Sequence, residues 1–219
     1  MVAVAGLFIT LEGIDGSGKS TQARLLAGWL RQAGHAVCAT REPGGTEAGE
    51  SIRELLLSPH RSIPPETELF LYLADRALHV QAVVRPALAG GHIVVCERYS
   101  DSTLAYQGYG RGLDLELLHR LNALATGGLS PQLTVVLDLA PEQARLDAKR
   151  LDRLESEGVE FVARVAEGFR ELARAEPDRI KLVNGSAEVD VVHAEIVTLV
   201  QRLLERPSPA AGGQIGRGP

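Results

Sequence analysis

The fold of this chain is decided by the stretch Gly13-Ile14-Asp15-Gly16-Ser17-Gly18-Lys19-Ser20, with Thr21 after it. The stretch fits G-x-x-x-x-G-K-[ST], the pattern of a phosphate-binding loop. An apolar run precedes it and a stretch of helical period follows, so backbone N–H groups and a helix N-terminus would face a triphosphate. We expect residues 13–21 to bind nucleotide phosphates, with Lys19 on the β- and γ-phosphates and the Ser20 hydroxyl on Mg²⁺.

Outward from this loop, apolar runs of strand length alternate with stretches of helical period, which is typical of a parallel α/β sheet. The runs are nearly continuous Val, Ile and Leu, as in strands covered by helices on both faces. The predicted strands are residues 7–11, 36–40, 93–97, 133–139 and 180–183. The predicted helices are residues 19–32, 47–57, 66–89, 115–126, 141–150, 159–174 and 189–206.

Composition indicates an ordinary globular protein, because 45% of the 219 residues are hydrophobic and 23% are charged. We expect one domain over residues 1–206 and a disordered tail at 207–219, where Pro, Gly and Ser leave almost nothing to bury. The formal net charge of -5 gives no field that would attract nucleic acid. The apolar start up to Leu11 is too short to span a membrane.

The two cysteines, Cys38 and Cys96, lie far apart in apolar predicted strands. This pattern is typical of buried thiols in a reducing compartment rather than of a disulfide framework. We therefore expect a cytoplasmic protein.

A phosphate loop alone does not separate kinases from other nucleotide-binding proteins. The chain lacks the guanine-reading Asn-Lys-x-Asp and the Asp-x-x-Gly strand end of a GTPase switch. The block Thr40-Arg41-Glu42-Pro43-Gly44-Gly45-Thr46 follows the second predicted strand, where parallel sheets present their ligand sites. Here the sequence closely resembles the thymidylate kinase family, which carries an Arg-Glu-Pro-Gly-Gly loop in this place.

Two further blocks carry the resemblance. Residues 97–108, Glu-Arg-Tyr-Ser-Asp-Ser-Thr-Leu-Ala-Tyr-Gln-Gly, are similar to the family's Asp-Arg-(Tyr or His) segment with its Ala-Tyr-Gln-Gly ending. Residues 149–155, Lys-Arg-Leu-Asp-Arg-Leu-Glu, are similar to its basic lid. The resemblance runs from about Phe8 to Leu204. It implies a P-loop NTPase fold with strand order 2-3-1-4-5, a lid at about 145–158, a homodimer, and phosphorylation of dTMP by ATP and Mg²⁺.

Phosphoryl transfer to a monophosphate requires cations more than a strong base, because the acceptor is already an anion. Arginine suits this task, since its forked guanidinium matches phosphate oxygens. The resemblance implies that Arg41 holds the phosphate of dTMP and that Arg98 bridges the acceptor and donor phosphates. It also implies that Asp15 lies close to the sugar 3′-hydroxyl and the metal.

Position 17 is a serine, so the phosphate loop offers no basic residue beyond Lys19. Family members with a neutral loop, the bacterial type, place their catalytic arginine in the lid. The candidates in this chain are Lys149, Arg150 and Arg153, and the sequence leaves the choice between Arg150 and Arg153 open.

Aromatic residues are scarce, at 4%, yet several gather between positions 70 and 109. The resemblance implies that Tyr72 stacks on thymine, although the family usually has phenylalanine there. It implies that Arg76, one helical turn later, donates to a base carbonyl. The other acceptor-site residues that it implies are Ser102, Thr103 and Gln107 as base contacts and Tyr106 as the residue that disfavours a 2′-hydroxyl.

Glu97 is a departure, because the family normally has aspartate before the arginine. Deoxynucleoside kinases use a glutamate in this place as the base for a 5′-hydroxyl, and such a kinase is the alternative enzyme. The Arg41–Gly45 loop and the Tyr106–Gly108 segment favour the monophosphate kinase, so we interpret Glu97 as a carboxylate that orders Mg²⁺ through water. A nucleotide-dependent switch that binds a protein partner is the non-enzymatic alternative.

Overall fold

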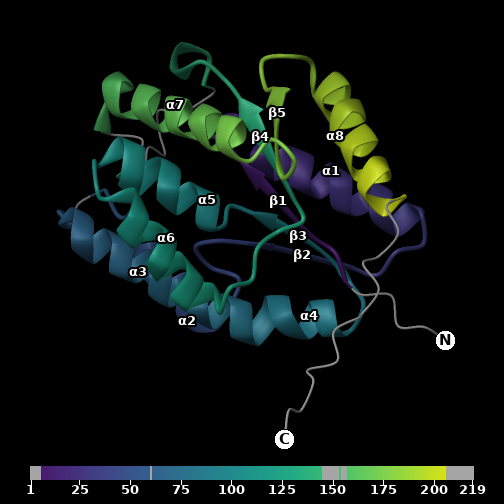
Figure 1. Cartoon of the computed structure of the whole chain (residues 1–219), viewed down its shortest axis with the longest axis horizontal. Coiled ribbons are helices and arrows are strands. Elements are labelled where there is room, and N and C mark those ends of the chain that lie inside the picture. Colours follow the sequence, from purple (N-terminus) through teal and green to yellow (C-terminus); the bar gives the residue numbers. More distant parts are fainter. Residues whose placement is uncertain (1–5, 60, 145–152, 154–156, 206–219) are drawn as a thin grey trace, which may run out of the picture.

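The computed structural model describes residues 6–59, 61–144, 153 and 157–205. The predicted tail, most of the predicted lid, and Lys149 and Arg150 lie outside these residues. Five parallel strands form one sheet in the order β2-β3-β1-β4-β5, which confirms the order implied by the resemblance (Figure 1). The strands are β1 (Phe8–Glu12), β2 (Val37–Arg41), β3 (Ile93–Glu97), β4 (Leu133–Asp138) and β5 (Ile180–Asn184). Each predicted strand is confirmed to within a residue at either end.

The long helices begin and end close to the predicted limits. They are α1 (Lys19–Gln32), α2 (Glu47–Leu57), α3 (Pro65–His79), α6 (Leu115–Thr126), α7 (Val159–Ala175) and α8 (Val189–Leu204). The helix predicted at 141–150 begins as a 3₁₀ turn, η3 (Pro141–Gln143), and its second half lies outside the described residues. Among the described residues, no helix has both the length and the apolar character needed to cross a bilayer.

Alternate side chains of each strand pack on opposite faces of the sheet. Ile9 and Leu11 of β1 belong to a buried cluster with Leu26 of α1 and Ile196 of α8. Phe8 lies on the other face, in a buried cluster with Val94 and Cys96 of β3 and with residues that follow α3 and β3. Figure 1 shows α1 and α8 on one side of the sheet and α3, α6 and α7 on the other. Both faces are covered, which explains why the strands lack polar alternation.

The helix predicted at 66–89 is interrupted by a wide turn. It runs as α3, a π-helical turn η1 (Val80–Val84) and α4 (Arg85–Ala89) without a break in the helical backbone. The Arg85 N–H bonds to the Val80 carbonyl, five residues back. Pro86 follows directly, and proline lacks an N–H and crowds the carbonyl four residues before it. The π turn accommodates the proline within the helix.

A second irregular helix lies after β3, where no helix was predicted. It comprises α5 (Ser100–Thr103) and a π-helical segment, η2 (Leu104–Gly110). Two glycines let η2 and α7 approach closely. A Cβ on Gly110 would lie 2.7 Å from the Phe161 ring, and one on Gly168 would lie 2.7 Å from the Tyr109 ring. This close packing presents the side chains of α5 and η2 at the carboxyl edge of the sheet.

Candidate active site

The phosphate loop connects β1 to α1 and depends on backbone conformations that only glycine adopts easily. Gly13 has φ +134° and Gly18, directly before α1, has φ +95°. A Cβ on Gly13 would also lie 2.7 Å from the Leu137 carbonyl of the neighbouring strand. The loop borders a cleft of about 490 Å³ whose far side includes Gly185 and Ser186, after β5. We call this the donor cleft.

Lys19 is buried beneath the loop. Its Nζ donates to the Ile14 carbonyl at 2.7 Å and lies 3.8 Å from Asp15 Oδ1. Burial, together with the positive charge of Arg98, lowers the pKa of Lys19 to about 8. An anion placed in the donor cleft would favour the charged form of this lysine.

Ser20 and Glu97 both line the donor cleft and contact each other. The Ser20 hydroxyl donates to Glu97 Oε1 at 2.8 Å, so the two predicted metal-binding residues lie side by side. Hard oxygen donors of this kind suit Mg²⁺, which takes its remaining ligands from phosphates and water. No group of three or more His, Cys, Asp or Glu suited to a metal is found within the described part of the chain. The pair therefore fits a metal carried in with the nucleotide.

Arg98 joins the phosphate loop to a second pocket. It has a left-handed backbone, with φ +66°, and its Nη1 donates to the Gly13 carbonyl at 3.2 Å and to Ser102 Oγ at 3.1 Å. Its Nη2 bonds to Asp15 Oδ1 and to the Tyr106 hydroxyl. Burial opposes the ionisation of Asp15, but the Arg98 guanidinium outweighs burial and holds the pKa of Asp15 at about 2. Arg98 is therefore held by hydrogen bonds to the phosphate loop on one side and to α5 and η2 on the other.

Glu12 holds the backbone next to Arg98. Its carboxylate is fully buried and accepts the Tyr99 N–H at 2.7 Å and the Ser102 hydroxyl at 2.6 Å. Burial and the nearby Asp101 carboxylate raise the pKa of Glu12 to about 7. Arg98 has a strained, left-handed backbone conformation, and the buried Glu12 carboxyl group fixes the next backbone N–H, that of Tyr99.

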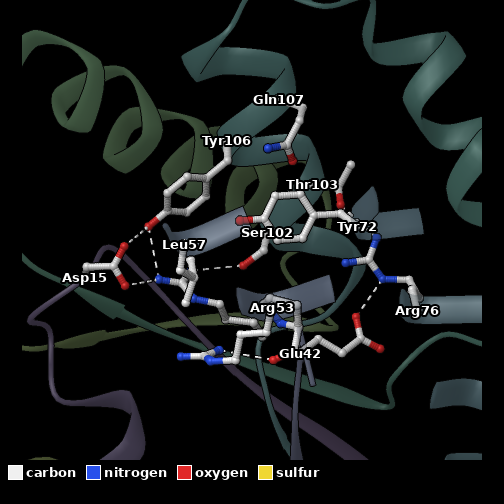
Figure 2. A pocket seen from close by; sticks show the side chains of 12 residues that line it. Asp15, Glu42, Arg53, Leu57, Tyr72, Arg76, Ser102, Thr103, Tyr106 and Gln107 are labelled. Atoms are coloured by element: carbon white, nitrogen blue, oxygen red, sulfur yellow. Dashed lines mark hydrogen bonds and ion pairs between the residues drawn. The ribbon is translucent and has the colours of Figure 1, made fainter. Parts of the chain in front are cut away.

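The second pocket lies between α3, α5, η2 and the loop after β2, and we call it the acceptor pocket (Figure 2). It brings together most of the residues predicted to bind the phosphate acceptor. These are Asp15, Tyr72, Arg76, Arg98, Ser102, Thr103, Tyr106 and Gln107. In the view of Figure 2 the Tyr72 ring lies with Gln107 on one side and with Arg53 and Glu42 on the other.

Arg76 is buried at the inner end of this pocket and makes four hydrogen bonds. Its Nε donates to Glu42 at 2.8 Å, Nη1 to Thr103 at 2.7 Å and to Asn122 at 2.8 Å, and Nη2 to the Tyr99 carbonyl at 2.9 Å. A guanidinium carries five N–H groups. The second hydrogen of Nη2 has no acceptor among the described residues and remains for a ligand.

The sequence did not identify Arg53, which lines the acceptor pocket from α2. Its Nη1 donates to the Pro43 carbonyl at 3.1 Å, so it lies against the Arg-Glu-Pro-Gly-Gly loop. Arg53 is one helical turn after the buried Gly49 and shares its inward face, but the sequence alone does not show which face of α2 turns inward. Glu42 was also missed as a pocket residue, although it belongs to the quoted motif.

Two predicted arginines lie elsewhere. The Arg41 side chain is 49% exposed, donates to Glu50 at 3.0 Å and lines a separate surface hollow beside α1. Arg153 is buried, and it donates to Glu68 at 2.5 Å and to the Leu56 carbonyl at 3.0 Å. Neither lines the acceptor pocket or the donor cleft in this structure. Arg150 lies outside the described residues.

A phosphate loop on one cleft, with an arginine that connects it to a second pocket, defines a P-loop kinase that binds two phosphate-bearing substrates. A family model for thymidylate kinase matches residues 11–196 of the chain. The chain therefore belongs to the thymidylate kinase family, as its motifs predicted.

Curated thymidylate kinases match this chain over nearly their whole length. A thymidylate kinase of Synechococcus sp. (strain JA-2-3B'a(2-13)) is 54% identical over 206 residues, which cover 94% of this chain and 98% of the relative. One from Clavibacter michiganensis subsp. michiganensis is 51% identical over 205 residues, 92% of this chain and 97% of the relative. The crystal structure of thymidylate kinase from Ehrlichia chaffeensis superposes with a TM-score of 0.74 at 36% identity, covering 90% of this chain and 99% of that chain.

Proposed function

We propose that the chain transfers the γ-phosphoryl group of ATP to dTMP, giving ADP and dTDP. The contacts of Arg98 carry the proposal. Its guanidinium is bonded to Gly13 and Asp15 of the phosphate loop and to Ser102 and Tyr106 of the acceptor pocket. It is therefore positioned to neutralise charge on the group that moves between the two sites.

In this proposal the phosphate of dTMP binds Arg53 and Arg98. Both line the acceptor pocket, whereas the predicted phosphate ligand Arg41 is engaged with Glu50 outside it. Arg153 is engaged with Glu68, so the catalytic lid arginine of our proposal is Arg150.

The base of dTMP would lie against the Tyr72 ring. The remaining N–H of Arg76 would donate to a base carbonyl, with Thr103 and Gln107 beside it. The Tyr106 hydroxyl is 3.1 Å from Asp15 Oδ2, and the buried ring leaves little space beside the sugar, which favours a deoxyribose.

Mg²⁺ would be held by Ser20 with Glu97 behind it, and when bound it would neutralise charge on the β- and γ-phosphates. Lys19 binds phosphate oxygens from the loop side. The same geometry bears on the alternative enzyme, in which Glu97 is a base for a 5′-hydroxyl. Glu97 lines the donor cleft and is bonded to Ser20, while the acceptor pocket is lined by Asp15 and Arg98. This placement favours the metal role.

We also propose that two copies associate through α2, α3 and α6, giving a homodimer. These helices pack side by side (Figure 1) and expose large apolar side chains on their outer face. Phe70 of α3 is 61% exposed and Leu124 of α6 is 80% exposed, and Leu55 of α2 and Leu117 of α6 are exposed as well. Large exposed apolar side chains on adjacent helices are typical of an interface. Sedimentation of the wild type and of Phe70→Glu tests it, with a dimer expected only for the former.

A coupled ADP-release assay with ATP and Mg²⁺ tests the reaction, with thymidine, dTMP, dUMP and UMP offered separately. Turnover led by dTMP supports the proposal. Turnover led by thymidine would make Glu97 a base and favour a deoxynucleoside kinase. Absence of turnover with every acceptor would favour the nucleotide-dependent switch. The predicted cytoplasmic location remains a prediction.

A further inference from the structure

Glu68 of α3 is a fully buried carboxylate that the reaction does not use. Its Oε1 accepts from Gln107 Nε2 at 2.7 Å and from Arg111 Nε at 3.4 Å. Its Oε2 accepts from Arg111 Nη2 at 3.0 Å and from Arg153 Nη2 at 2.5 Å. Two guanidinium groups thus face one carboxylate, and each of these four hydrogen bonds from described residues is donated to it.

This arrangement fixes the side-chain amide of Gln107. An ionised carboxylate can only accept hydrogen bonds, so the amide must present its nitrogen to Glu68. The flipped amide would place two oxygens 2.7 Å apart in a buried site and lose the bond. The amide oxygen is thereby directed away from Glu68. Gln107 lines the acceptor pocket, and Figure 2 shows its oxygen on the side of Tyr72.

We propose that Glu68 is a positioning residue that selects the acceptor base, by holding the Gln107 amide with its oxygen toward the pocket. The inference rests on the proposed function. Thymine and uracil carry a carbonyl at position 4 and an N–H at ring position 3. Cytosine carries an amino group and a bare nitrogen at those positions. The spare N–H of Arg76 matches the carbonyl, and the Gln107 oxygen matches the ring N–H.

The same pair of groups rejects cytosine. Its amino group would face the Arg76 guanidinium, and its ring nitrogen would face the Gln107 oxygen. A site built to hydrogen-bond one edge discriminates strongly against a ligand that leaves its buried groups unpaired. Discrimination therefore requires that the amide cannot flip.

Glu68→Gln removes this constraint, because a glutamine at 68 can donate or accept and so permits either orientation of Gln107. We expect the ratio of kcat/KM for dTMP to that for dCMP to fall at least about tenfold, which corresponds to about 1.4 kcal/mol. The dTMP to dUMP ratio should stay within about twofold, because thymine and uracil share the edge that is read. General structural damage would lower activity with all three acceptors together and leave both ratios unchanged.

Arg111→Gln is the matched control. It removes an ion pair from Glu68 but leaves the carboxylate on Gln107, so the dTMP to dCMP ratio should remain that of the wild type. Gln107→Leu is a second variant that leaves both arginine pairs of Glu68 in place, and it should lower the ratio even if Glu68→Gln fails to fold. Adding Glu68→Gln to Gln107→Leu should then change the ratio no further.

The outcomes separate the two proposals. A wild type that does not use dTMP overturns the proposed function. A wild type that prefers dTMP, with folded Glu68→Gln or Gln107→Leu proteins that keep the wild-type ratio, overturns only the role of Glu68.

Discussion

The donor cleft and the acceptor pocket are built in different ways. The cleft's phosphate loop is one continuous stretch, residues 13–21, shaped by glycines with positive φ between a strand and a helix. The acceptor pocket collects side chains from Asp15 to Gln107, and buried hydrogen bonds of Arg76 and Glu42 hold them. In the proposed reaction the loop would present backbone N–H groups to the triphosphate, while the pocket would match one acceptor through side chains. Substitutions should therefore affect the two sites differently.

Arg98→Ala tests the residue that connects the two sites. We expect kcat to fall about a thousandfold or more, because a cation aimed at the transferring phosphoryl group is lost. Steady-state kinetics with dTMP and ATP measure the effect. Arg202→Ala, an exposed arginine on α8, is the control and should retain full activity. If a folded Arg98→Ala protein retained most of its kcat, phosphoryl transfer would not depend on the arginine that connects the two sites.

Glu42→Ala tests the support of the acceptor pocket. Glu42 accepts from Arg76 at 2.8 Å and from His79 Nδ1 at 2.9 Å, and all three side chains are buried. Its removal leaves the Arg76 guanidinium without its counter-charge, which should cost about 3 to 5 kcal/mol of the free energy of unfolding. Urea unfolding measures the loss, and Glu54→Ala on the exposed side of α2 is the control.

The folded Glu42→Ala protein should lose affinity for dTMP and still bind ATP, because Glu42 lines the acceptor pocket and not the donor cleft. Calorimetric titration with each nucleotide decides this. An equal loss of affinity for both would show that the two sites are not independently supported.

Arg53→Ala and Arg41→Ala form a matched pair. Arg53 lines the acceptor pocket, whereas Arg41 pairs with Glu50 at the surface. We expect Arg53→Ala to raise the KM for dTMP about a hundredfold, by about 2.7 kcal/mol, and Arg41→Ala to change it less than about threefold. The KM for ATP should change little in both. If Arg41→Ala raised the KM for dTMP more than Arg53→Ala did, Arg41 would be the ligand of the dTMP phosphate.

The sequence predicted the fold well because the relevant information is local. The glycine pattern of residues 13–21 and the apolar strands are each readable within a few neighbours, and the strand order followed from the family resemblance. The two π-helical segments were missed. The cause of η2 is tertiary, since Gly110 packs against Phe161 of α7 and no period in the sequence reports that contact. The turn η1 lies just before Pro86, so the sequence did contain a local signal for it.

The acceptor pocket was predicted only where a motif marked it. Tyr106 and Gln107 lie in a quoted block and line the pocket. Arg53 lies in an ordinary amphipathic helix, and its role depends on which face of α2 turns inward. The buried pair of Arg153 with Glu68 joins residues 85 positions apart, which spacing along the chain cannot show.

Glu12→Gln tests the carboxyl group beneath Arg98 through pH. Because the folded-state pKa is raised from 4.5 to about 7, the stability that Glu12 contributes is present below pH 4.5 and is lost as pH rises toward and through 7. Glutamine does not titrate. At pH 8 the variant should therefore gain about 2 kcal/mol of unfolding free energy relative to the wild type, since relief of the buried charge exceeds the loss of one hydrogen bond. At pH 4 the gain should vanish or reverse. Urea unfolding of both proteins at the two pH values measures the difference, and a difference that is independent of pH would mean that Glu12 titrates alike in the folded and unfolded chains.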